Sequence, residues 1–157
     1  MNTRPTSWNP GGGAELRVTP IAGITDLSPA TGGVELREGY DWQDFYVTPG
    51  TLGYIDQVSQ TDNGALHQIS VQGFAPNDAP TYSDVLARLT GIPLLIRFRE
   101  YADSTWRQVG SLTTGMTLTY TYESGSDVPD SRGYTLKLAG DFDQACFLLS
   151  PSIAQNG

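Results

Sequence analysis

The sequence predicts a mainly β protein: a β-sandwich or a partly closed barrel of about ten short strands, with one short flanking helix. Glycine (18) and proline (10) are frequent among the 157 residues, which is typical of short strands joined by tight turns. Several segments alternate apolar and polar side chains with the period of two that a half-buried strand requires. Only one segment carries apolar residues at helical spacing. The length favours a single domain.

The chain divides into three regions. Residues 1–14 hold two prolines, a run of three glycines and almost no apolar side chain apart from Trp8, so we expect an extended arm. A disordered terminus is the alternative. Residues 15–149 form the single β-rich domain, and residues 150–157 form a tail without a pattern. The start has no apolar signal-peptide core, and no run of about 18 apolar residues occurs, so we expect neither a secretory signal nor a membrane span.

In the first half of the β-rich domain, alternation from Glu15 predicts a strand that buries Leu16 and Val18. We expect a loop to follow through residue 33, because Gly, Ser, Pro and Thr dominate there. Short strands are expected at residues 34–37 and 45–47. Residues 52–59 and 66–74 predict a hairpin, since Asn63-Gly64 between them is typical of a type I′ turn with two positive φ angles.

The expected helix begins near Thr81, a candidate N-cap residue with Asp84 three positions later. Gly91 supplies a left-handed stop, and Pro93 prevents continuation. The apolar stripe of this helix consists of Tyr82, Val85, Leu86 and Leu89. Its ten or fewer residues need a sheet to pack against.

After the helix the chain returns to strands. The continuous run Leu94-Leu95-Ile96 predicts a strand that is covered on both faces at that end. The expected strands of this half lie at residues 92–101, 105–109, 116–122, 134–138 and 145–149.

Charge and arginine usage say most about partners. The chain has 17 acidic and 9 basic residues, a formal net charge of -8, and this balance disfavours electrostatic binding of nucleic acid. Eight of the nine basic residues are arginine, the cation preferred in interfaces. Arg97 and Arg99 alternate on one strand and point to the same side, and we expect Arg107 of the next strand to join them. With Trp8 they form the candidate interface set; the alternative is a solvated face paired with Glu100 or Asp103.

Residues that carry chemistry are few. The only histidine, His67, lacks a catalytic partner at a recognisable spacing, and the only cysteine, Cys146, lies in an apolar segment and excludes a disulfide within the chain. Three aspartate pairs occur in turns: Asp41 with Asp44, Asp127 with Asp130, and Asp141 with Asp143. None has the spacing of an EF-hand loop, and turn geometry already accounts for them, although binding of a calcium ion stays open. We therefore expect no catalytic residues, no metal site and no cofactor.

The segment from Ile92 to Leu149 resembles tail-region structural proteins of tailed bacteriophages. The resemblance rests on the order of four strands and on their sequences, which are Pro93-Leu94-Leu95-Ile96-Arg97-Phe98, Trp106-Arg107-Gln108-Val109-Gly110, Met116-Thr117-Leu118-Thr119-Tyr120-Thr121-Tyr122, and Arg132-Gly133-Tyr134-Thr135-Leu136-Lys137-Leu138-Ala139-Gly140 followed by Ala145-Cys146-Phe147. It covers about 60 residues, its motifs are structural, and it does not distinguish a tail tube, terminator, neck or adaptor protein.

This resemblance implies two packed sheets, a flanking helix and long loops or arms that stack ring on ring. The expected function is that of a virion structural protein, assembled in the host cytoplasm into rings or a tube that lines or caps a DNA conduit. Its partners would be copies of itself, neighbouring tail proteins and passing DNA that it does not bind specifically, with no membrane. The alternative is a carbohydrate-binding β-sandwich module that uses Trp42, Trp106 and tyrosines as sugar platforms. An enzyme is not expected.

Overall fold

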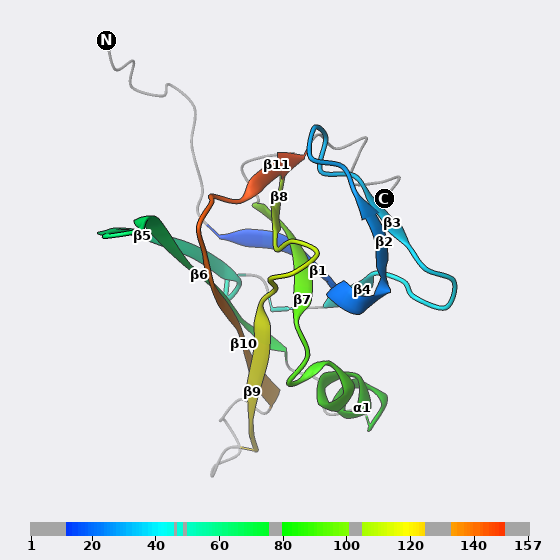
Figure 1. Ribbon diagram of the computed structural model, residues 1–157. Coiled ribbons are helices and arrows are strands. Elements are labelled where there is room, and N and C mark those ends of the chain that lie inside the picture. Colours follow the sequence, from blue (N-terminus) through cyan, green and yellow to red (C-terminus); the bar gives the residue numbers. More distant parts are fainter. Residues whose placement is uncertain are drawn as a thin grey trace.

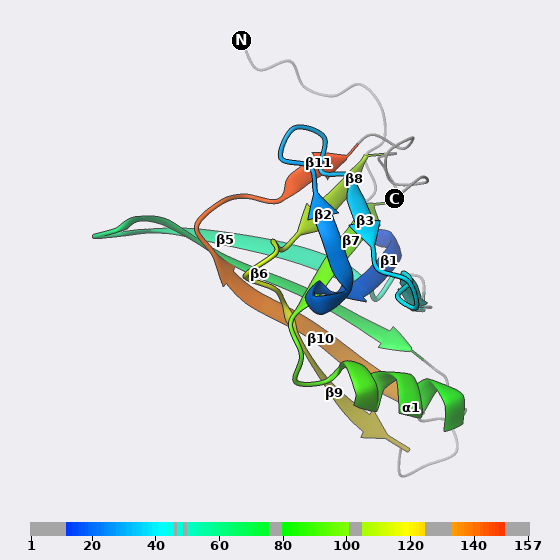
Figure 2. The same cartoon turned by 45° about the vertical axis from the view of Figure 1, so that its right-hand side comes forward.

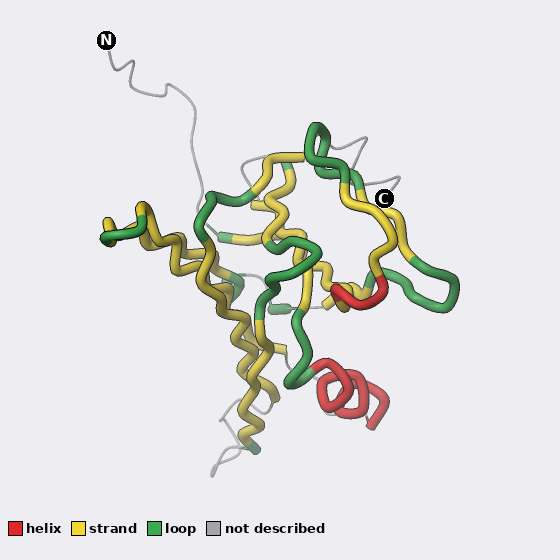
Figure 3. Tube along the Cα trace, viewed as in Figure 1, coloured by secondary structure: helices red, strands yellow, loops and turns green. Residues whose placement is uncertain are grey.

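The structure is a computed structural model that describes residues 12–45, 47–48, 50–75, 80–100, 105–124 and 133–149, with only the backbone described at 80–82. Within these residues eleven strands and one α-helix are present, and strands dominate the trace (Figures 1 and 3). In chain order the elements are β1 (Gly13–Pro20), the short 3-10 helix η1 (Ile21–Gly23), β2 (Ile24–Leu27), β3 (Val34–Leu36), β4 (Gln43–Phe45), β5 (Gly53–Thr61), β6 (Gly64–Ala75), α1 (Pro80–Leu89), β7 (Leu94–Glu100), β8 (Trp106–Val109), β9 (Thr117–Glu123), β10 (Gly133–Phe142) and β11 (Phe147–Leu149).

The strands form three antiparallel sheets. A five-stranded sheet has the order β11-β8-β7-β1-β4, a four-stranded sheet has the order β5-β6-β10-β9, and β2 and β3 form a two-stranded ribbon. No sheet closes into a barrel. The predicted mainly β fold with one short helix is confirmed in its sandwich-like form.

The main core lies between the two larger sheets. Alternate residues of β1, β6, β7 and β10 supply it, for example Val18, Ile69, Ile96 and Leu138, each at most 1% exposed. The sheets meet where Leu94 and Met116 exchange two backbone hydrogen bonds of 2.9 and 2.8 Å. Burial of these aliphatic side chains is the principal driving force for the sandwich.

The other face of the five-stranded sheet is covered by the β2–β3 ribbon. Leu95 is fully buried there against Ile24 and Val34, with Trp42 beside them. Leu94, Leu95 and Ile96 are all 0% exposed, so the prediction that this run is covered on both faces is confirmed. The ribbon was not expected, because residues 24–27 fall in the segment predicted as loop.

Helix α1 packs at the end of the sandwich where β6 and β9 finish (Figure 2). Leu86 is fully buried and Leu89 is 9% exposed, as the predicted stripe requires. Gly91 has a φ of +85°, which confirms the predicted left-handed stop. The helix begins at Pro80, so Thr81 lies inside its first turn and the predicted N-cap at Thr81 is wrong.

The β5–β6 hairpin extends beyond the body of the molecule on the left of Figures 1 and 2. Thr61 pairs with Gly64 across a two-residue turn. Gly64 has a φ of +113°, and no described non-glycine residue has a positive φ. The predicted hairpin is confirmed, but the predicted type I′ geometry at Asn63-Gly64 is wrong, because the turn is centred one residue earlier.

Candidate functional site

The predicted arginine row is only partly an exposed surface. In the antiparallel registers Arg17 lies opposite Arg97, and Glu15 lies opposite Arg99. Arg97 and Arg99 therefore share one face of the five-stranded sheet, as the alternation predicted. Arg97 is 0% exposed, however, so its side chain contacts the interior of its own chain and is not available to a neighbouring copy.

Arg97 lies between the five-stranded sheet and the segments that cover it. Its guanidinium carbon lies 4.3 Å from the centre of the Trp42 ring, a cation–π contact. Its Nε donates to Gln108 Oε1 at 2.9 Å, and Gln108 Nε2 donates in turn to the carbonyl of Gly32 at 2.8 Å. Burial, with the charge of Arg17, lowers the pKa of Arg97 to about 10, so the group stays charged at neutral pH.

Arg17 and Arg99 complete this face, and both are held by groups of the same chain. Arg99 donates to Glu15 at 3.0 Å, while Arg17 lies 2.8 Å from Asp44. Both guanidinium groups lie over the ring of Trp106, at 4.8 Å for Arg17 and 5.9 Å for Arg99. Sequence reasoning missed Arg17, because the pairing of β1 with β7 joins segments that are some 80 residues apart.

Arg107 does not join this row. It pairs with Phe98 and not with Arg97, so it points to the opposite face of the sheet, and the prediction that it extends the row is wrong. There it lies 3.4 Å from Glu100, donates to Cys146 Sγ at 3.4 Å, and stacks 5.5 Å from the Tyr54 ring centre. The ion pair with Glu100 matches the alternative weighed above for this set. Trp8 and Asp103 lie outside the described residues.

The two tryptophans proposed as sugar platforms have packing roles. Trp106 is 5% exposed beneath two arginines, and the ring of Trp42 faces Arg97. Trp106 therefore offers no open ring face to a sugar, and Arg97 lies over one face of the partly buried Trp42 ring. The carbohydrate-binding alternative therefore gains no structural support from these two residues.

The remaining titratable groups show no catalytic arrangement among the described residues. His67 Nδ1 lies 3.0 and 3.1 Å from the two carboxylate oxygens of Asp56, and no described serine or cysteine is bonded to its ring. Tyr54 stacks on Phe98, with ring centres 5.3 Å apart, and burial together with contact to Cys146 raises its pKa. No group of three or more metal-ligating side chains occurs among the described residues.

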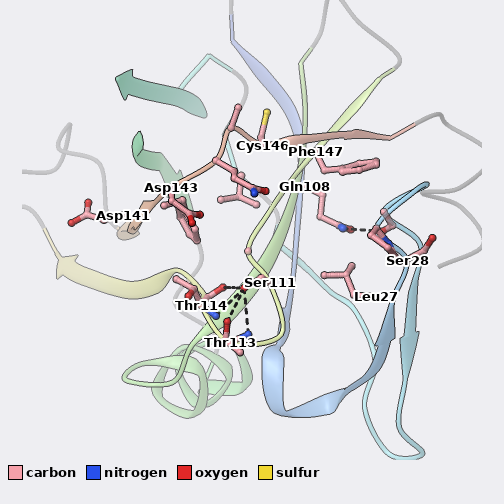
Figure 4. Close-up of a pocket in the computed structure, with 17 residues that line it drawn as sticks. Leu27, Ser28, Gln108, Ser111, Thr113, Thr114, Asp141, Asp143, Cys146 and Phe147 are labelled. Carbon is pink, nitrogen blue, oxygen red and sulfur yellow. Dashed lines mark hydrogen bonds between the residues drawn. The ribbon is translucent and has the colours of Figure 1, made fainter. Parts of the chain in front are cut away.

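The aspartate pairs have distinct surroundings. Asp41 accepts a hydrogen bond from the backbone of Trp42 at 2.8 Å, which is turn geometry, and Asp44 pairs with Arg17. Asp141 and Asp143 line a cavity of about 600 Å³ beside the loop that contains Ser111 (Figure 4). Asp127 and Asp130 lie outside the described residues.

The surfaces that do project outward are the β5–β6 hairpin and an apolar groove. On β5 the side chains of Ile55 and Val58 are 62% and 56% exposed. The groove, of about 690 Å³, has three further exposed apolar side chains in its wall: Tyr40, Ile92 and Leu112. Neither surface was predicted, because the groove unites four separate segments and the exposure of the hairpin depends on its distance from the core.

Within the described residues no helix is long and apolar enough to cross a membrane. Comparison of the chain with protein-family models, with curated proteins and with solved structures found no match in any of the three.

Proposed function

We propose that this chain is a structural subunit of the tail region of a tailed bacteriophage, which assembles with copies of itself into rings or a tube. The proposal starts from the resemblance of the segment from Ile92 to Leu149. The fold supports it, because two packed sheets and a flanking helix are features that the resemblance implies.

The observation that carries the proposal is the β5–β6 hairpin. Among the described strands, β5 pairs only with β6, so its outer edge presents unpaired backbone groups over nine residues. Its one charged residue, Asp56, is engaged with His67, while Ile55 and Val58 stand exposed. Monomeric proteins usually protect such an edge with charges or proline, so this edge is typical of a surface that a partner covers.

The negative net charge of the chain is compatible with a role as the lining of a DNA conduit. The net charge of -8 per copy is multiplied around a ring, which gives an acidic field that repels phosphate and lets DNA slide. Arg17, Arg97, Arg99 and Arg107 are held by carboxylates, rings and polar groups of their own chain. These four cations therefore do not form a free basic patch that would retain DNA.

Two measurements on the purified chain test the proposal. Negative-stain microscopy at rising concentration should show rings or tubes of uniform diameter, because a repeated contact between identical subunits closes or stacks regularly. A gel-shift assay with duplex DNA at low salt should show no binding. Particles of one-subunit size at every concentration, or salt-sensitive DNA binding, would contradict the proposal.

A further inference from the structure

The groove that contains Leu112 is an unusual concentration of exposed apolar surface. Seven large apolar side chains are exposed in the described part of the chain, and three of them, Tyr40 (43%), Ile92 (37%) and Leu112 (49%), line this one groove. Contiguous apolar surface of this kind marks an interaction site, whereas singly scattered apolar residues do not.

The groove is held in shape by backbone hydrogen bonds between its walls. The N–H of Ile21 donates to the carbonyl of Pro93 at 3.1 Å, and the N–H of Arg37 donates to the carbonyl of Gly23 at 2.8 Å. The ring of Tyr40 lies against Gly23 so closely that a side chain there would displace it. A preformed groove binds its occupant without a large ordering cost.

The charges of the groove and of the hairpin are complementary. Arg37 is the only charged residue in the lining, and it forms no ion pair with another described residue. The β5–β6 hairpin carries two carboxylates, Asp56 and Asp62, and neither lysine nor arginine. Asp62 is exposed at the tip, four residues along the chain from the exposed Val58.

We propose that the groove receives the distal end of the β5–β6 hairpin of a second copy, with Val58 against the apolar wall and Asp62 next to Arg37. This inference rests on the proposed function and names the contact through which the copies assemble. In Figures 1 and 2 the β5–β6 hairpin points to the left, away from the β2–β3 ribbon, whose strand β2 supplies Ile24 and Thr25 to the groove. The contact is therefore heterologous, so each bound copy keeps a free hairpin or a free groove and the chain of contacts continues into a ring or filament.

Paired variants with matched controls test the two halves of the contact. Leu112→Asp places a charge in the groove, and Thr114→Asp places the same charge in the same loop outside it. Val58→Asp alters the docking face of β5, and Gln57→Asp alters the opposite face. We expect each groove or docking-face variant to raise the dissociation constant at least about tenfold, and each control to leave it within about twofold. Val58→Ser, which adds no charge near Asp56, should weaken association in the same direction, and circular dichroism checks that each variant is folded.

A mixing experiment tests the head-to-tail geometry. Val58→Asp and Leu112→Asp should each be monomeric alone. When the two variants are mixed, the intact hairpin of Leu112→Asp can bind the intact groove of Val58→Asp. Each pair of chains then forms one productive contact. The expected product is a 1:1 heterodimer of twice 16.9 kDa that grows no further.

Charge exchange tests the pairing of Arg37 with Asp62. Arg37→Glu and Asp62→Arg should each weaken association, because each places like charges opposite one another, and the double variant should restore it. If the wild-type chain associates but Leu112→Asp behaves like Thr114→Asp, or if the mixture gives no heterodimer, the groove is not the receiving site, while the proposed function stands. If the wild-type chain never associates, both proposals fail.

Discussion

Arg97 shows how one cation is tolerated beneath the segments that cover the outer face of the five-stranded sheet. Its side chain is fully buried, and the cost of desolvation is offset by the Trp42 ring at 4.3 Å and by the hydrogen bond to Gln108. A planar guanidinium can stack on a ring and donate sideways at the same time, whereas an ammonium cannot.

The first prediction follows from that geometry. Arg97→Lys should lower the free energy of unfolding by about 2 kcal/mol, because it loses the stacked plane and leaves Gln108 Oε1 without its donor. Urea denaturation measures the change. Arg88→Lys, at an exposed position on α1, should change stability by less than about 0.5 kcal/mol. Equal stability of Arg97→Lys and the wild-type chain would show that the stacked arrangement is unimportant.

Tyr54 gives a prediction for alkaline pH. Its pKa is raised in the folded state by burial and by Cys146, so above about pH 10 the unfolded chain loses the phenolic proton while the folded chain keeps it. Stability is then lost as the pH rises, by up to about 1.4 kcal/mol per pH unit. Tyr54→Phe should reduce this loss, and Tyr122→Phe, at an exposed position, should not. The measurement is denaturation between pH 9 and 11, and identical slopes for the two variants would contradict it.

For individual residues, the sequence predicted which side chains of one strand share a face of the sheet. It did not predict which side chains of neighbouring strands lie on that same face. Arg97 and Arg99 share a face because alternate residues of any strand do. Whether Arg107 faces Arg97 or Phe98 depends on the register across residues 101–104, and a shift by one residue reverses the face. The burial of Arg97 depends on the β2–β3 ribbon and Trp42, which no local pattern connects to β7.

Among the elements, the β5–β6 hairpin turn shows why a strong motif still leaves its geometry open. Asn63-Gly64 correctly predicts a hairpin, but the turn places Asp62 and Asn63 at its centre and gives the positive φ to Gly64 alone. The hydroxyl of Thr61 accepts a hydrogen bond from the N–H of Asn63 at 3.3 Å and donates to the carbonyl of Gly64 at 2.8 Å. These bonds support the turn that is observed.

The turn can be tested by two substitutions. Gly64→Ala should cost about 1 kcal/mol, because a Cβ is strained at positive φ, whereas Asn63→Ala should cost less than about 0.5 kcal/mol. Thermal unfolding of the two variants makes the comparison. A type I′ turn at Asn63-Gly64 would instead make Asn63→Ala comparably costly, and that outcome would contradict the geometry described.

Most elements could be predicted from local pattern, and their pairing could not. The β5–β6 hairpin, the helix and β7 to β10 follow from periodicity and turn residues. The strand β2 was missed because only Ile24 and Leu27 give it apolar character. The strands β3 and β4, expected on either side of one turn, pair with β2 and β1 and not with each other.

For the whole molecule, the important feature is the separation of the hairpin from the groove. The groove draws on four segments, residues 20–25, 37–40, 92–93 and 112–113, so it exists only after the fold has brought these segments together. Self-association is therefore a prediction from composition and resemblance, whereas the surfaces proposed for it could not be predicted from the sequence. Large interfaces between copies are compatible with the low content of charged residues, 17%.

The central claim is that this chain works by binding copies of itself. Sedimentation velocity over a wide concentration range, with Val58→Asp and Gln57→Asp run in parallel, tests it most directly. The account predicts that the wild-type chain and Gln57→Asp form species well above 16.9 kDa as the concentration rises, while Val58→Asp sediments as a monomer. A wild-type chain that sediments as a monomer at every concentration would contradict the account.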